Sequence, residues 1–111
     1  MSVLDLFKLG GQVAVVTGSG KGIGKGIAIA LAQAGADIVL ASRSEDELKK
    51  VAKEIEAIGR KALVVPTDVT DIKSMENLGQ KAVDGFGKLS IWVNNAGGLP
   101  DGTPRYLTRT S

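Results

Sequence analysis

One segment constrains the fold of this chain more than any other: residues 13–24, with the sequence VAVVTGSGKGIG. A nearly all-apolar run leads directly into a turn with four glycines, and an apolar pattern with helical spacing begins after it. Such a run suits a strand buried on both faces of a parallel sheet. Glycines let backbone N–H groups approach an anion closely, and the N-terminus of the next helix attracts negative charge. The segment therefore predicts a phosphate-binding strand–turn–helix unit.

Strand and helix patterns keep alternating as far as residue 95. Apolar runs predict strands over residues 12–17, 37–42, 62–66 and 89–93. Apolar residues at helical spacing predict a helix after each of the first three strands, with three stripes: Ile23, Ile27, Leu31 and Ala34; Leu48, Val51, Ala52, Ile55 and Ile58; Ile72, Met75, Leu78, Ala82 and Phe86. We expect glycines to end these helices, at Gly35, Gly59 and Gly87, and a capping box to start the second, with Ser44 and Glu47.

The order β-α-β-α-β-α-β predicts an α/β fold with a Rossmann-type, doubly wound parallel sheet. Right-handed crossovers give an expected strand order of 3-2-1-4. A length of 111 residues fits one domain. We therefore interpret residues 1–111 as part of a single Rossmann-type domain.

Beyond residue 95 the regular patterns stop. Glycine and proline cluster between residues 97 and 104, and this composition predicts a loop. The fourth strand would then be an apolar edge of the sheet, and one face of the sheet would carry a single helix. Because folded proteins avoid long apolar edges, we hypothesise that the chain is part of a larger domain.

Composition excludes several classes of function. The 14 basic and 12 acidic residues leave a net charge of +2 without a basic stripe, so we expect no nucleic-acid partner. Cysteine and histidine are both absent, which removes disulfides and thiolate or imidazole ligands, and we expect no metal site. No apolar run suits a signal peptide or approaches the ~20 residues of a membrane span. We therefore expect a cytoplasmic protein with no membrane partner.

The end of the second strand bears on the choice of cofactor. An acidic residue there would bind the ribose 2′-OH of NAD, whereas an arginine suits the 2′-phosphate of NADP. Ser42 and Arg43 stand at this position, and Lys21 in the glycine turn adds a second cation. These residues favour NADP(H) over NAD(H). The alternative is that both cations are solvated surface charges, with Arg43 paired to Glu45 or Asp46.

The ends of the third and fourth strands carry further candidate residues. Asp68, followed by Val69, can accept a hydrogen bond from an adenine amine, or it can serve as a loop or helix-capping residue in competition with Thr70 and Asp71. The fourth strand ends in Asn94-Asn95-Ala96-Gly97, where small residues leave room for a ribose and nicotinamide. The alternative there is a polar strand end that forms a turn.

Two other interpretations of the glycine turn are weaker. A P-loop requires G-x-x-x-x-G-K-[ST], but Val15 stands at the first glycine position and Gly22 follows Lys21. A plain strand-to-helix turn would not need glycines at four of the seven positions from 18 to 24.

Together these motifs resemble the short-chain dehydrogenase/reductase family. The resemblance rests on TGSGKGIG at 17–24, Asp68-Val69 and NNAG at 94–97, in the order and approximate spacing of the family. It implies a Rossmann fold and NAD(P)(H)-dependent hydride transfer to or from a small-molecule carbonyl or alcohol. The implied cofactor contacts are the pyrophosphate with Gly18, Ser19, Gly20, Lys21, Gly22, Ile23 and Gly24, the 2′-phosphate with Ser42 and Arg43, the adenine with Asp68 and Val69, and the ribose with Asn94 and Gly97, next to Ala96.

The chain also departs from the family pattern. Ser90 replaces the usual aspartate before the Asn-Asn motif, and Trp92 replaces a smaller aliphatic residue and is expected to pack in the core. The family's catalytic serine, its Tyr-x-x-x-Lys and an asparagine all follow that motif, but Tyr106 has Thr110 four residues later. We therefore assign no catalytic residue, and the resemblance implies that residues 1–111 are the N-terminal part of a single dinucleotide-binding domain, without its catalytic C-terminal part. The expected full-length protein is a homo-oligomer, and the alternatives are a non-catalytic dinucleotide-binding fragment or a truncated product.

Overall fold

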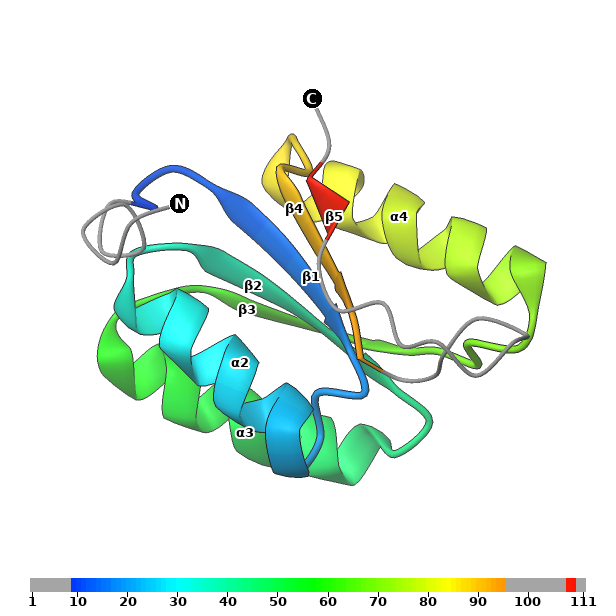
Figure 1. Ribbon diagram of the computed structural model, residues 1–111, viewed down its shortest axis with the longest axis horizontal. Coiled ribbons are helices and arrows are strands. Elements are labelled where there is room, and N and C mark those ends of the chain that lie inside the picture. The colour runs from blue at the N-terminus through cyan, green and yellow to red at the C-terminus, as the bar shows by residue number, and fades with distance from the viewer. Residues whose placement is uncertain (1–8, 96–107, 110–111) are drawn as a thin grey trace.

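The computed structural model describes residues 9–95 and 108–109, and the side chains of residues 9–95. Strands and helices alternate along the described chain, as predicted, up to the fourth strand (Figure 1). The elements are β1 (Val13–Thr17), α2 (Gly22–Gln33), β2 (Asp37–Ser42), α3 (Glu45–Ile58), β3 (Ala62–Pro66), α4 (Ile72–Phe86), β4 (Ile91–Asn94) and β5 (Thr108–Arg109).

The strands form one sheet with the order β3-β2-β1-β4-β5. The first four strands are parallel, and β1 lies between β2 and β4, with Val15 opposite Val39 on one side and Trp92 on the other. This arrangement confirms the predicted α/β fold and the strand order 3-2-1-4. The chain changes direction across the sheet between β1 and β4, which places a topological switch point at the carboxyl ends of these two strands.

The far edge of the sheet differs from the prediction. Residues Thr108–Arg109 form the short strand β5, which runs antiparallel to β4 and pairs Arg109 with Ile91 and Thr108 with Trp92. The expectations that regular structure stops at residue 95 and that β4 is an edge strand were therefore wrong. The loop predicted between residues 97 and 104 lies outside the described residues. Two residues are too few to show apolar periodicity, so the pairing depends on the neighbouring strand and not on a local pattern.

Helices cover both faces of the sheet. Helices α2 and α3 lie on one face and α4 on the other, so one face carries a single helix among the described residues, as expected (Figure 1). Strand side chains alternate between two cores: Ala14, Val16, Ile38 and Leu40 face α2 and α3, while Val13, Val15, Val39 and Ala41 face α4. Trp92 is half-buried and packs with the α4 core, as its predicted packing role requires.

Helix α2 packs on the sheet through smaller residues than its sequence pattern suggested. Its buried residues are Gly24, Ala28 and Ala32, one position along from the predicted Ile23, Ile27 and Leu31, and Ile23 is 72% exposed. Ala34, the fourth predicted member, is buried directly after the helix. Ile27 and Leu31 are only partly buried at the edge of this surface. Small side chains let the helix axis lie close to the sheet, and a stripe chosen by hydrophobicity alone overlooks them.

Helices α3 and α4 follow their predicted stripes except at one end of each. Ser44 caps α3 by accepting a hydrogen bond from the Glu47 N–H, and Gly59 ends that helix in the left-handed conformation, with φ of 96°. Ile58 and Ile72 were predicted to be buried but are 39% and 76% exposed. Both lie in terminal turns, and helical periodicity carries no information on how far a helix extends past its sheet.

The closeness of α2 to the sheet predicts a strong effect of the substitution Gly24→Ala. A Cβ atom at residue 24 would lie 2.0 Å from the Gly18 carbonyl oxygen and 2.7 Å from Asn95 Nδ2. We expect the free energy of unfolding to fall by at least about 3 kcal/mol, measured by urea denaturation. The matched control is Gly26→Ala in the same helix, where nothing lies within 4 Å of the added atom. Because alanine favours the helix, this control should gain about 0.5–1 kcal/mol; equal effects at both positions would contradict the close packing.

Candidate functional site

The predicted site residues gather at the carboxyl ends of the parallel strands. The glycine turn follows β1, Ser42 ends β2, Asp68 follows β3 by two residues, and Asn94 ends β4. Parallel strands bring their carboxyl ends to one edge of the sheet, and in open α/β sheets ligands bind outside that edge at the switch point. The fold therefore brings together residues that lie up to 76 positions apart, as with Gly18 and Asn94.

The first half of the glycine turn is fastened to β2. The Gly18 N–H donates to the Ala41 carbonyl oxygen at 2.7 Å, and the Ser19 N–H reaches the same oxygen at 3.4 Å. The Ser19 side chain is fully buried, and its Oγ accepts from the Ala41 N–H at 3.0 Å. Gly18 has a φ of 63°, a conformation that favours glycine. These two residues therefore shape the turn, and the N–H groups left for an anion begin after them.

The second half of the turn opens helix α2 without a side-chain cap. Lys21 is the N-cap residue, makes no capping hydrogen bond, and is followed by no acidic residue in the first turn. By contrast, α3 has Ser44 as its cap and three acidic residues in its first turn, and α4 is capped by Asp71. The first N–H groups of a helix need partners, and its positive end attracts an anion. The N-terminus of α2 thus has the properties of an anion site.

The ends of β1 and β4 are joined through Thr17. Its buried Oγ1 accepts from the Asn95 N–H at 2.9 Å and donates to Asn94 Oδ1 at 2.9 Å. Asn95 Nδ2 also donates to the Gly18 carbonyl oxygen at 3.5 Å. The Asn94 side chain thus has a partner within the protein. Sequence reasoning missed the roles of Thr17 and Asn95, although both lie within the two quoted motifs, at residues 17–24 and 94–97.

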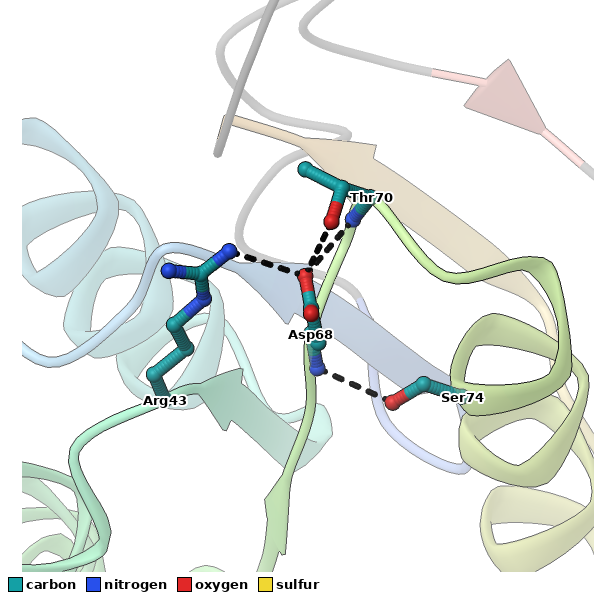
Figure 2. Close-up of polar contacts among 4 residues, drawn as sticks. All are labelled: Arg43, Asp68, Thr70 and Ser74. Atoms are coloured by element: carbon teal, nitrogen blue, oxygen red, sulfur yellow. Dashed lines mark hydrogen bonds and ion pairs between the residues drawn. The ribbon is translucent and has the colours of Figure 1, made fainter.

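Arg43 and Asp68 were assigned to two ends of the adenosine, but they contact each other. Arg43 Nη2 lies 3.0 Å from Asp68 Oδ1, which joins the turn after β2 to the turn after β3 (Figure 2). The considered partners Glu45 and Asp46 are therefore not those of Arg43. Asp71, not Asp68 or Thr70, caps α4 by accepting from the Lys73 N–H at 3.0 Å.

Thr70 holds the Asp68 carboxylate. The Thr70 hydroxyl donates to Oδ1 at 2.6 Å, and the Thr70 N–H donates to the same oxygen at 2.9 Å. The pKa of Asp68 is lowered to about 2, first by the hydroxyl of Thr70, then by its N–H group, and then by Arg43. Asp68 is therefore ionised throughout the neutral and mildly acidic range.

A hollow of about 400 Å³ lies between the ends of β2 and β3. It includes the predicted residues Ser42, Arg43 and Val69, and its full lining is Ser42, Arg43, Ser44, Glu47, Thr67, Val69 and Thr70. The glycine turn borders this region, because a Cβ on Gly20 would lie 3.0 Å from Glu47 Cβ and 3.4 Å from Ser42 Oγ. Sequence reasoning missed Glu47, because its position had been explained by the capping box.

Other predicted features are less closely tied to this region. Lys21 is exposed and has no ionic partner among the described residues, and Ala96 and Gly97 lie outside the described residues. A larger hollow of about 520 Å³ is lined by residues that include Arg60 and Lys61 before β3, and none of its lining residues is a predicted site residue.

Within residues 9–95, no group of three or more acidic, cysteine or histidine side chains is placed to hold a metal ion. No helix of the described chain has the length and apolar character needed to cross a bilayer.

Comparisons with known proteins agree with this arrangement. A family model for the short chain dehydrogenases matches residues 12–110. An uncharacterised oxidoreductase from Mycobacterium tuberculosis is 48% identical over 109 residues, which cover 98% of this chain and 40% of that protein. Versicolorin reductase 1 from Dothistroma septosporum is 47% identical over 98 residues, which cover 87% of this chain and 37% of that protein. A crystal structure of a short-chain type dehydrogenase/reductase from Mycobacterium marinum matches with a TM-score of 0.81 and 43% identity, covering 89% of this chain and 40% of that one.

The chain belongs to the short-chain dehydrogenase family of oxidoreductases. This membership confirms the resemblance found in the three sequence motifs. The chain spans 37–40% of the length of the relatives named above.

The contacts of Asp68 predict how its titration should respond to substitution. Thr70→Val removes the hydroxyl that contributes most to the lowered pKa, so the Asp68 pKa should rise from about 2. Because this pKa is below the ordinary value of ~3.9, the ionised carboxylate stabilises the fold above that value, and the contribution is lost as the pH falls toward 2. Carboxyl NMR titration provides the measurement. Thr70→Ser keeps a hydroxyl and should keep the low pKa; an unchanged pKa in Thr70→Val would contradict the assignment.

Proposed function

We propose that this chain forms the NADP(H)-binding part of an oxidoreductase that interconverts a small-molecule carbonyl and alcohol. The observation that carries the proposal is the uncapped N-terminus of α2, directly after a glycine turn at the switch point of a parallel sheet. An isolated helix end would be weak evidence. Here, family membership and the hollow beside Arg43 support the same interpretation.

In this proposal the pyrophosphate binds to the N–H groups at the start of α2. Gly20, Lys21, Gly22, Ile23 and Gly24 supply the cradle, while Gly18 and Ser19 hold it in shape through β2. Gly22 has a φ of 62°, and no atom lies within 4 Å of a Cβ built on it, so the backbone there is open to a ligand. The residues present thus fit a diphosphate.

The adenosine would extend from this cradle into the hollow between β2 and β3. Ser42 and Arg43 would bind its 2′-phosphate, with Lys21 of the glycine turn as a second cation, and Asp68 and Val69 would meet the adenine. The preference for NADP(H) over NAD(H) rests on the arginine and on the absence of an acidic residue at the end of β2. Glu47 adds a carboxylate to the hollow, so the selection of a phosphate depends on the charge of Arg43.

The nicotinamide end would follow the carboxyl end of β4, where Asn94, Ala96 and Gly97 would contact the ribose. The bound cofactor would supply the hydride to a carbonyl or accept it from an alcohol. The serine, tyrosine and lysine of the family are proposed to lie in a segment beyond residue 111, together with the substrate pocket and the contacts of a homo-oligomer. We further propose a cytoplasmic location, because a reductase of this kind draws on the intracellular pool of NADP(H).

The assignment of no catalytic residue predicts binding without turnover. The 111-residue chain should bind NADPH, seen as a change in the fluorescence of the nicotinamide, but it should not oxidise NADPH in the presence of carbonyl compounds. A longer product of the same gene that includes the family's C-terminal segment should do both. Turnover by the short chain would contradict the assignment, and failure of both products to bind NADPH would refute the proposed function.

The role of Arg43 predicts a selective effect of the substitution Arg43→Gln. Loss of the guanidinium should weaken NADPH binding about tenfold or more, since charged hydrogen bonds contribute about 1.5–3 kcal/mol, while NADH binding changes little. Isothermal titration calorimetry gives both affinities. Lys53→Gln, which removes a charge from an exposed position on α3, is the matched control. Equal losses for both cofactors would refute contact of Arg43 with the 2′-phosphate.

A further inference from the structure

Arg43 and Arg60 use their side-chain donors in different ways. Arg60 Nη1 donates to the Gly35 carbonyl oxygen at 2.9 Å, and its Nε donates to the Gly59 carbonyl oxygen at 3.1 Å and lies 3.7 Å from Asp37 Oδ1. Within residues 9–95, Arg43 has a single side-chain partner, Asp68, and the Arg43 side chain is 72% exposed. A guanidinium carries five N–H donors. Most donors of Arg43 therefore have no partner among the described residues.

Asp68, the partner of Arg43, is also held by hydrogen bonds that do not involve Arg43. Asp68 Oδ1 accepts from both the hydroxyl and the N–H of Thr70, at 2.6 and 2.9 Å. The Asp68 N–H in turn donates to Ser74 Oγ in the first turn of α4, at 2.9 Å (Figure 2). The carboxylate is thus held in the turn after β3, and Arg43, which lines the hollow, reaches it from the turn after β2.

We propose that Asp68 is a positioning residue, which holds the Arg43 guanidinium beside the hollow with its remaining donors open to the 2′-phosphate of NADP(H). Asp68 thereby raises selectivity for the phosphorylated cofactor, in addition to any contact with the adenine. This inference rests on the proposed function.

Two opposing effects decide the direction of this role. An arginine loses rotamer freedom when it binds a phosphate, and one that is already held has lost part of that freedom beforehand. Against this, the carboxylate repels the phosphate and occupies one donor. We expect the gain from restricting the arginine to prevail. Asp68 holds Arg43 through a single hydrogen bond, so the other guanidinium donors stay open to the phosphate. Both side chains are exposed enough for solvent to screen the repulsion between the carboxylate and the phosphate.

The test compares adenosine 2′,5′-bisphosphate with ADP, two probes that lack nicotinamide. Calorimetry on the full-length gene product gives the ratio of the two affinities. Asp68→Ala should lower the preference for the 2′-phosphate about two- to fivefold, the size expected of an exposed ion pair. Asp68→Asn keeps an oxygen acceptor and should lie closer to the wild type. In an Arg43→Gln background, Asp68→Ala should leave the ratio unchanged.

Several controls keep this test decisive. Asp84→Asn removes a carboxylate from the last turn of α4 and should leave the ratio unchanged. If Asp68→Ala does not fold, Thr70→Val takes its place, since it loosens the carboxylate without removing the charge and should also lower the ratio. A higher ratio in the Asp68 variants would show that Asp68 competes for Arg43, and an unchanged ratio would show no role; either overturns the inference. A wild-type protein that binds neither probe would refute the proposed function itself, and this inference with it.

Discussion

The structure depends on the contact between the start of α2 and the end of β1. Gly24 lies so near the Gly18 carbonyl oxygen that a single added carbon would overlap it. Asn95 Nδ2 donates to the same oxygen, and the Asn95 N–H donates to Thr17. One small region therefore joins a helix, the glycine turn and two central strands. Its geometry leaves the first N–H groups of α2 at the switch point of the sheet.

The three helices within residues 9–95 differ in how their N-termini are capped. Ser44 and Asp71 cap α3 and α4, which stabilises each helix within the chain itself. Helix α2 begins at Gly22, its N-cap residue Lys21 makes no side-chain capping hydrogen bond, and its first turn has no acidic residue. A bound anion would supply what α2 lacks. The same region is therefore incomplete as a helix end and suitable as a binding site.

In the region proposed for the adenosine, the fold gives several residues contacts other than those predicted from the sequence. Arg43 and Asp68 were predicted as separate contacts for a phosphate and a base, yet they form a pair across the ends of β2 and β3. Thr70, considered only as a possible helix cap, is instead the main cause of the lowered pKa of Asp68. The Glu47 N–H donates to the capping side chain of Ser44, and Glu47 also lines the hollow. Sequence spacing could not reveal the pair of Arg43 and Asp68, because it joins two different turns.

The strands and their order could be predicted because each buried strand is an apolar run bounded by turn residues. The helix faces were harder to predict. The α2 stripe was placed one residue away from Gly24, Ala28 and Ala32, since hydrophobicity favours large residues and close packing favours small ones. The short strand β5 was missed altogether, because two residues carry no periodic signal and pair only where β4 presents a free edge.

The sequence by itself determined the parallel α/β architecture, the family and the position of the glycine turn. Local physics was sufficient for the architecture and the turn, since apolar period, left-handed glycines and helix caps depend on neighbours in the chain, whereas the family was identified by the resemblance of three motifs. Tertiary structure alone decided which N–H groups of the turn remain open, that Thr17 joins β1 to β4, and that Arg43 is held by Asp68. These properties depend on distances between strand ends, and such distances exist only after the sheet has formed.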